Sequence, residues 1–313
     1  MIRNNIVKRY SAEEYAKIKE QEKKELAENL SEGIKRALDY DKYKRYLKFM
    51  GNCHNYSYTN SMLIYLQNEN ATVVKSFTDW KKDKVNINKN EKGIKIFCPV
   101  KKRINIYQKD KSGNFILDDK GEKIKESEKE ITNFIVGNVF DISQTNANSK
   151  NYQLLIYDKD KIQNKEDILN KLEKVSNIKF EFKDNLNGAS GRYFPKEEKI
   201  EIKANMEDLE TISTCIHEVA HSILHKDTNK IKIPKKQVEF EAESVAYVVC
   251  NKLNINCKNN NFLYLANWVG KEDISEFKNS LERIQKASND ILKEFDIQKE
   301  NIKINVKENE VVR

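Results

Sequence analysis

The HExxH segment at residues 217–221 constrains the fold of this 313-residue chain more than any other stretch. In a helix, His217 and His221 lie one turn apart on the same face, so that both imidazoles can reach one metal ion. Glu218 then lies beside the open coordination position, where it can take a proton from bound water as a general base. The alternative is a surface helix that contains two histidines by chance, which is uncommon in a chain with only 4 histidines.

The third ligand of such a site has to come from another segment. His225 extends the series of histidines at intervals of four, but it lies about 12 Å beyond His217 along a helix axis, too far to share an ion. It is expected to cap the helix or to face solvent. The better donors are the carboxylates Glu239, Glu241 and Glu243 of an acidic segment downstream.

Helical spacing separates these three carboxylates. Glu239 shares a face with Ala242 and Ala246, whose small side chains let this helix approach the HExxH helix closely. We therefore predict Glu239 as the third ligand of one Zn²⁺ ion per chain, with Glu241 as the main alternative. Glu243, one turn beyond Glu239, is placed to orient a ligating histidine. The remaining carboxylates are expected to be solvated.

Basic residues are concentrated in the N-terminal half of the chain. The whole sequence carries a net charge of +8, whereas residues 42–103 alone contain 14 basic and 4 acidic side chains, a net of +10. Such a field favours a polyanion, although a lysine-rich solvated face is the alternative. Aromatic residues are interleaved with this charge. A basic groove with exposed aromatic faces is what single-stranded DNA binding requires, unless the aromatics belong to the core.

The pattern of apolar residues predicts an α+β protein of two domains. Helical spacing covers 11–50 and 60–67, and short β-branched and aromatic runs between polar turns follow over 73–139. The polar stretch 143–151 is the candidate linker. Further segments complete the expectation: a helix at 167–175, strands at 178–182 and 199–202, a turn at 188–195, and helices near 209–226, 238–253 and 274–295. The domains are expected at 1–145 and 150–300, with a polar tail at 301–313.

Targeting signals are not evident in the sequence. Residues 1–36 are rich in Lys and Glu, unlike a signal peptide, and no apolar run is long enough to span a bilayer. The five cysteines form no C-x-x-C pair and are expected to be reduced thiols. These observations predict a cytoplasmic protein that has no membrane partner.

Several C-terminal segments form a recognisable combination. They are Gly191–Phe194, Lys199–Ile202, His217-Glu-Val-Ala-His221, Leu224-His225 and Glu239–Ala246. The combination resembles the ImmA/IrrE-like zinc metallopeptidases, where the first two segments are a turn and an edge strand. The resemblance implies a zincin-like, gluzincin-type domain with an HExxH active-site helix.

A second set of segments lies in the N-terminal half. It comprises Tyr56-Ser-Tyr-Thr-Asn60, Leu63-Ile64, Gln67, Ala71-Thr72, Ser76-Phe77, Trp80, Lys92–Ile96, Pro99 and Val139–Thr145. This set resembles the N-terminal domain of ArdC-type antirestriction proteins, and the order of the two domains is also that of the ArdC family. The resemblance implies a single-stranded-DNA-binding domain on a protein of conjugative mobile elements that protects incoming DNA. The residues expected to contact nucleic acid are Tyr56, Tyr58, Asn60, Trp80, Lys81, Lys82, Lys84, Lys92 and Lys95.

The sequence therefore predicts a single-stranded-DNA-binding antirestriction factor with a zinc metallopeptidase domain, in which Glu218 is the catalytic residue. A protein substrate is a further expected partner. Two alternatives remain open at this point. One is a non-catalytic DNA-protection protein whose zinc site only stabilises the fold. The other is a regulatory protease that cleaves a repressor, for which the basic N-terminal segment has no evident use.

Overall fold

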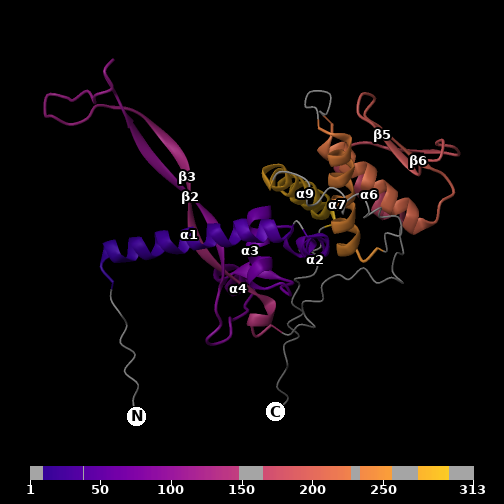
Figure 1. Cartoon of the computed structure of the whole chain (residues 1–313), viewed down its shortest axis with the longest axis horizontal. Helices are drawn as coiled ribbons and strands as arrows, with labels where there is room; N and C mark the ends of the chain where they lie inside the picture. The colour runs from indigo at the N-terminus through magenta and orange to yellow at the C-terminus, as the bar shows by residue number, and fades with distance from the viewer. Residues whose placement is uncertain (1–9, 38, 148–164, 227–232, 256–273, 296–313) are drawn as a thin grey trace, which may run out of the picture. The chain divides into compact units, whose positions relative to one another are not determined.

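The protein has a mixed α+β architecture, as its sequence predicts (Figure 1). The computed structural model describes residues 10–37, 39–147, 165–226, 233–255 and 274–295. Its contacts group the chain into two compact units, one formed by 1–26 with 95–137 and the other by 27–94 with 138–313. The boundary predicted near residue 145 lies within the second unit. The predicted tail at 301–313 is outside the described residues.

The first unit contains the N-terminal part of helix α1 (Ala12–Arg36) and most of a ribbon made by strands β2 (Ile94–Tyr107) and β3 (Lys125–Asp141). Lys95 at the base of the ribbon pairs with Glu22 of α1 at 3.2 Å. Strands were predicted for this region and are found, but they are long and continuous instead of short and separate. A long two-stranded ribbon exposes both faces, so polar residues interrupt its apolar pattern without ending the strands.

After the C-terminal end of α1, the second unit continues with helices that carry part of the basic segment 42–103. They are α2 (Tyr40–Met50), the 3₁₀ turn η1 (Gly51–Cys53), α3 (Tyr58–Gln67) and α4 (Phe77–Lys82), with the short strand β1 (Val74–Ser76) before α4. Asp39, Ser57 and Ser76 cap the three α-helices by accepting a backbone N–H three residues on. The helix α4 lies where only strands were expected, and its Ser-x-x-Asp cap is the signal that identifies it.

Part of the predicted linker is folded. Asp141 at the end of β3 accepts hydrogen bonds from the backbone N–H of Thr72 at 2.7 Å and of Ser143 at 3.0 Å. It thereby caps a 3₁₀ turn, η2 (Ile142–Gln144), in a reciprocal box with Gln144. Residues 143–147 are thus held by polar contacts, and 148–151 lie outside the described residues.

The C-terminal elements form a small sheet with helices packed on it. Strands β4 (Phe180–Lys183), β5 (Gly191–Phe194) and β6 (Lys199–Lys203) take the order β4-β6-β5, with β4 parallel and β5 antiparallel to β6. The helices are α5 (Lys165–Ser176), α6 (Asp208–Leu224), α7 (Lys235–Lys252) and α9 (Ile274–Glu294). The expectation that Lys199–Ile202 is an edge strand is wrong, since β6 is central and β5 lies at the edge.

Helices α2 and α7 share one core within the second unit. The ring of Tyr43 stacks on Phe240 with centroids 5.5 Å apart, and its hydroxyl lies 2.8 Å from Ser244 Oγ. Phe277 of α9 contacts the same two rings. All three aromatic side chains are fully buried. The N-terminal helices and the helices that carry the predicted metal ligands therefore belong to one packed body.

The sequence predicts reduced cysteines and no membrane-spanning segment. Cys53 and Cys215 are buried free thiols, whereas Cys250 is disulfide-bonded, so the expectation of reduced thiols is wrong for Cys250. Among the residues whose positions are described, no helix has the length and apolar character needed to cross a membrane.

Candidate metal centre

The predicted metal ligands lie on two helices that pack against each other. His217 and His221 are one turn apart on α6, and Glu239 is near the start of α7. Close approach of these helices is possible because small residues lie between them. Ala220 of α6 and Ala242 of α7 are completely buried, and Ala246 is nearly so.

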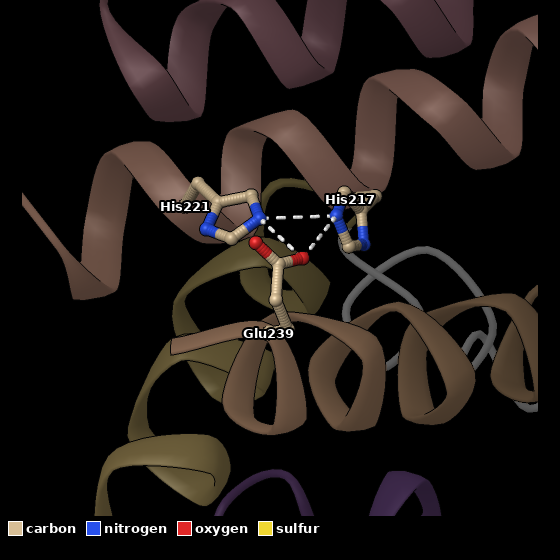
Figure 2. A group of neighbouring side chains, drawn as sticks. All are labelled: His217, His221 and Glu239. Carbon is tan, nitrogen blue, oxygen red and sulfur yellow. Dashed lines mark hydrogen bonds and ion pairs between the residues drawn. The ribbon is translucent and has the colours of Figure 1, made fainter. Parts of the chain in front are cut away.

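The ligand atoms of the three residues converge (Figure 2). His217 Nε2 lies 3.0 Å from His221 Nε2, and Glu239 Oε2 lies 3.8 Å and 3.6 Å from these two nitrogens. In a tetrahedral site with Zn–N bonds of about 2.0–2.1 Å, ligand atoms are roughly 3.3–3.4 Å apart. The observed distances bracket that value. The donor set therefore fits one small divalent cation with an open coordination position.

The protonation of His217 and Glu239 suits metal binding. Burial and the neighbouring His221 lower the pKa of His217, so its imidazole is neutral at pH 7 and has a lone pair to donate. The contact with His221 lowers the pKa of Glu239, which keeps that carboxylate ionised. A neutral imidazole and an ionised carboxylate are the ligand forms that a divalent ion requires.

Glu218 lies beside the cluster in an enclosed position. Its side chain is buried, with 6% of the residue exposed, and burial raises its pKa to about 7 against the opposing effect of His221 and of a backbone hydrogen bond from Tyr193. Gly191 of β5 makes this arrangement possible. A Cβ there would lie 2.8 Å from Glu218 Cγ and 2.6 Å from Thr214 Cγ2, too close for any larger residue.

Two cavities flank Glu218. One, of about 410 Å³, is lined by Arg192, Tyr193, Val238 and the three candidate ligands, and the other, of about 190 Å³, is lined by Ser190, Ser213, Thr214 and Glu243. Both include Gly191, His217 and Glu218 in their walls. The candidate centre therefore borders two cavities, and β5 forms part of the wall of each.

Glu243 lies near His217 but outside hydrogen-bonding distance of its ring. Its Oε1 lies 3.9 Å from His217 Nδ1, on the side of the ring opposite the cluster. Burial, with a smaller contribution from Glu239, raises the pKa of Glu243 to about 7. In the metal-free protein this carboxyl is therefore costly to ionise at neutral pH.

The raised pKa of Glu243 makes metal-free stability depend on pH. The carboxyl is protonated in both the folded and unfolded states below pH 4.5, so it carries no penalty there. As the pH rises from 4.5 to about 7, the unfolded state releases this proton while the folded state keeps it, so stability is lost across that window and the loss is complete above it. The variant Glu243→Gln is expected to match wild type near pH 4 and to exceed it above pH 7, by up to about 3 kcal/mol.

Thermal unfolding of both metal-free proteins between pH 4 and pH 8 measures this difference. Glu276→Gln, an exposed glutamate on α9, is the matched control and should show no pH-dependent gain. A Glu243→Gln variant that is less stable than wild type at pH 8 would contradict the assignment.

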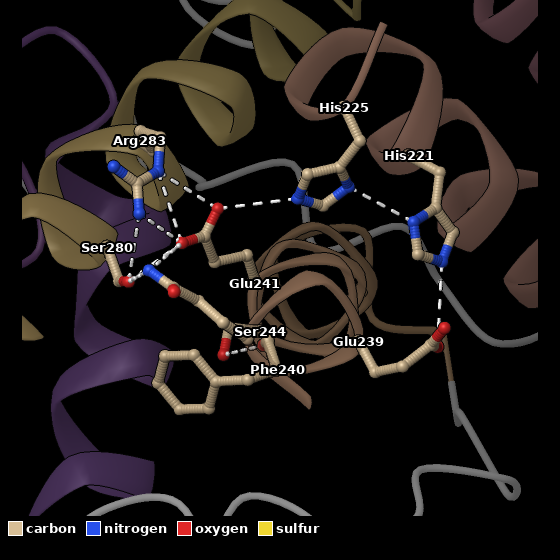
Figure 3. Close-up of polar contacts among 9 residues, drawn as sticks. His221, His225, Glu239, Phe240, Glu241, Ser244, Ser280 and Arg283 are labelled. Carbon is tan, nitrogen blue, oxygen red and sulfur yellow. Dashed lines mark hydrogen bonds and ion pairs between the residues drawn. The ribbon is translucent and has the colours of Figure 1, made fainter. Parts of the chain in front are cut away.

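His225 and Glu241 occupy positions that differ from expectation (Figure 3). His225 was predicted either to cap α6 or to face solvent. It caps α6 and is buried. Glu241, the alternative ligand, is completely buried and points away from the cluster toward Arg283 of α9. Glu241 was the alternative ligand, and instead of reaching the cluster it forms an ion pair with Arg283.

The residues predicted to contact nucleic acid fall into two groups. Tyr58 and Trp80 have buried rings, with the Trp80 indole N–H donating to Phe140 O at 2.8 Å, so both predictions of base stacking are wrong. Tyr56 and Asn60 are half-buried, and the Tyr56 hydroxyl donates to Val74 O. The lysines are accessible to solvent to different degrees: Lys81, Lys82, Lys84 and Lys92 are exposed, and Lys95 is half-buried.

Some residues of the site were not predicted from the sequence. The sequence predicts Gly191 only as part of a turn, although a glycine on a strand beside an active-site helix often marks a close backbone approach. It gives no role to Arg283 and Ser280 of α9. A charged residue next to the apolar stripe of α9 is the signal that points to a buried acidic partner.

Comparisons with known proteins give one relative along most of the chain. An uncharacterized protein of Bacillus anthracis is 27% identical, and the match covers 92% of this chain and 54% of the relative. The chain thus spans about half the length of this curated relative.

Two solved structures are also similar. The crystal structure of the metal-free antirestriction protein ArdC from plasmid R388 is 19% identical, covers 79% of this chain and 85% of its own, and has a TM-score of 0.42. The Mn(II)-bound structure of the same protein is 16% identical, with coverage of 80% and 86% and a TM-score of 0.40. The strongest family evidence concerns the N-terminal part, where residues 13–140 match the family model of the N-terminal domain of the anti-restriction factor ArdC.

Proposed function

We propose that this chain is a DNA-binding antirestriction factor whose α6 and α7 helices carry a metal-dependent peptide-hydrolysis site. The observation that carries the hydrolytic part is the convergence of His217, His221 and Glu239 beside the buried Glu218. The match of residues 13–140 to the ArdC N-terminal domain supports the antirestriction part and a role in protecting the DNA of a mobile element.

The residues have complementary roles in the proposed hydrolysis. A Zn²⁺ or similar divalent ion held by the three ligands supplies Lewis-acid polarisation and a bound water of lowered pKa. Glu218, with a pKa of about 7, accepts a proton at neutral pH and returns it to the leaving amine. An extended peptide would lie along β5, where the two cavities that border Gly191 and Glu218 would receive its side chains.

The direct test uses the whole chain loaded with Zn²⁺ or with Mn²⁺. Each form is incubated with a mixed-sequence peptide library, and cleavage products are identified by mass spectrometry. Hydrolysis that a chelator abolishes and that added metal restores supports the proposal. No cleavage by either loaded form, at confirmed metal occupancy, would contradict the hydrolytic part and leave the DNA-binding part standing.

The proposed DNA-binding surface has cationic side chains in two places within the second unit. Lys81, Lys84 and Lys92 are exposed around α4 and the loop that follows it. A cavity of about 460 Å³ is lined by Arg36, Lys42 and Arg45, with Tyr65 in its wall. Phosphate groups neutralised by such residues release counterions, which makes binding strongly dependent on salt.

Phe77 replaces Trp80 and Tyr58 as the candidate for base stacking. Phe77 is the first residue of α4 and is 58% exposed. Lys81 and Lys82 are at the other end of the same short helix. An exposed ring stacks only on unpaired bases, so it favours single-stranded over duplex DNA by about 1–3 kcal/mol for each stacked base.

For DNA binding we expect two separable effects. Replacing Lys81, Lys84 and Lys92 together with Ala should lower the slope of log affinity against log salt by about 2, for single strands. Phe77→Ala should weaken binding to single-stranded oligonucleotides and leave duplex binding unchanged. Fluorescence anisotropy on both oligonucleotide forms over a range of salt concentrations measures these effects.

A lysine that is already ion-paired provides the matched control. Lys199 of β6 lies 2.7 Å from Glu201, and Lys199→Ala should leave the salt slope as in wild type. Equal affinity for single-stranded and duplex DNA in wild type, unchanged by Phe77→Ala, would contradict the stacking prediction.

A further inference from the structure

A line of polar contacts leads from the candidate metal ligand His221 into the core of the second unit (Figure 3). His221 Nδ1 lies 3.1 Å from His225 Nδ1, and His225 Nε2 lies 3.4 Å from Glu241 Oε2. Arg283 Nε is 3.1 Å and 3.0 Å from the two oxygens of Glu241. The line therefore starts at the atom of His221 that faces away from the cluster and ends on an ionic anchor.

The inner end of this line is rigid. Glu241 is completely buried, and its Oε1 also accepts hydrogen bonds from Ser280 Oγ at 2.7 Å and from Gln237 Nε2 at 3.3 Å. The Arg283 guanidinium, which has only N–H donors, donates to both oxygens of Glu241, and Ser280 donates to Oε1 as well. An ionised carboxylate with this many donors accepts only; it has no proton to give.

The positions of the ring protons follow from this end point. Because the Glu241 carboxylate only accepts, the facing Nε2 of His225 carries a proton and donates it. A neutral His225 then has an unprotonated Nδ1, which accepts from His221 Nδ1–H. His221 in turn has its lone pair on Nε2, the atom that faces His217 and Glu239. Every hydrogen bond along the line has one donor and one acceptor in this assignment.

The geometry points to His225, anchored by Glu241 and Arg283, as a positioning residue that fixes the tautomer and ring orientation of His221 for metal binding. This inference rests on the proposed metal site. It assigns Glu241 the role of an anchor instead of a ligand. An imidazole ring rotates easily about its outer torsion, so a ligating histidine without a partner on its second nitrogen binds metal less tightly.

Metal affinity in three variants tests the role of His225. Leucine has no acceptor, so His225→Leu is expected to weaken Zn²⁺ binding by about 10–100-fold. Asparagine can place its Oδ1 near the position of Nδ1, so His225→Asn should recover part of the loss. Glu239→Ala, which removes a proposed ligand, should lose more affinity than either. Competition with a chromophoric chelator measures each dissociation constant on the full-length chain.

A spectroscopic measurement on wild type does not depend on how well the variants fold. The chain has only 4 histidines, so their ring ¹⁵N signals can be assigned by single substitutions. The expected result in the Zn²⁺-loaded protein is His225 as the Nε2–H tautomer and His221 as the Nδ1–H tautomer. The opposite tautomer at His225 would overturn the inference, because that ring could not accept from His221.

The outcomes separate this inference from the proposed function. Wild type that binds Zn²⁺, with His225→Leu weakened and His225→Asn partly restored, supports both. Wild type that binds Zn²⁺ with His225→Leu within twofold of it overturns the role of His225 alone. Wild type that binds neither Zn²⁺ nor Mn²⁺ overturns the metal site, and the inference with it.

Discussion

Replacing Glu218 with Gln is expected to reduce peptide hydrolysis by about 10²–10⁴-fold while the metal stays bound. Glutamine has the same shape as glutamate, and its amide oxygen can still accept from the Tyr193 backbone N–H. It cannot take up a proton, so it cannot serve as the base. The comparison to make is kcat/KM for the best peptide from the library, with metal content measured on the same preparations.

Glu207→Gln is the matched control for this experiment. Glu207 precedes α6, is exposed, and makes no side-chain cap to the helix, so the variant should hydrolyse peptide at the wild-type rate. If Glu218→Gln cleaves as fast as wild type, Glu218 is not the base. If the Glu218→Gln variant protects DNA as well as wild type does, DNA protection does not need catalysis, as the non-catalytic alternative holds.

Removing either candidate histidine ligand should empty the metal site. His217→Ala or His221→Ala leaves one imidazole and one carboxylate, which is too few protein ligands for a stable zinc site of the catalytic type. Bound metal is expected to fall from about one per chain in wild type to a small fraction of that. Elemental analysis by mass spectrometry after desalting provides the measurement.

His54 supplies the control for the histidine variants because it lies in a different part of the fold. Its ring contacts Gly51 O at 3.3 Å, and His54→Gln should keep full metal content. Near-stoichiometric metal retained in both His217→Ala and His221→Ala would show that other residues bind the ion.

The helices of the metal centre could be predicted from the sequence because periodicity identifies them. The apolar face of 208–224 and the alanines of the next helix place His217, His221 and Glu239 on facing surfaces, and the structure brings these three together. Excluding His225 as a ligand required only the rise of a helix along its axis. These inferences depend on spacing within one helix or on the packing of two.

The environment of Glu241 could not be predicted in this way. Whether a carboxylate is solvated or buried depends on its partner, and the partner of Glu241 is Arg283, which lies 42 residues further along the chain. Spacing within α7 gives no information about that contact. The same limitation explains Trp80, whose indole N–H is satisfied by Phe140 O across 60 residues of sequence. Interleaved lysines suggested an exposed ring, but the Trp80 ring is fully buried, and Lys75 lies over it with its Nζ 5.2 Å from the ring centroid.

The stacking of Tyr43 on Phe240 limits how such a chain can be recombined in evolution. If a gene fusion joined residues 1–145 to an unrelated C-terminal segment, the buried ring of Tyr43 would lose its partner and become exposed to water. If instead the C-terminal segment were joined to an unrelated N-terminal segment, Ser244 would lose the Tyr43 hydroxyl that it contacts. Substitutions at Tyr43 should therefore be accompanied by changes at Phe240 or Ser244, so that the two segments are inherited as a pair.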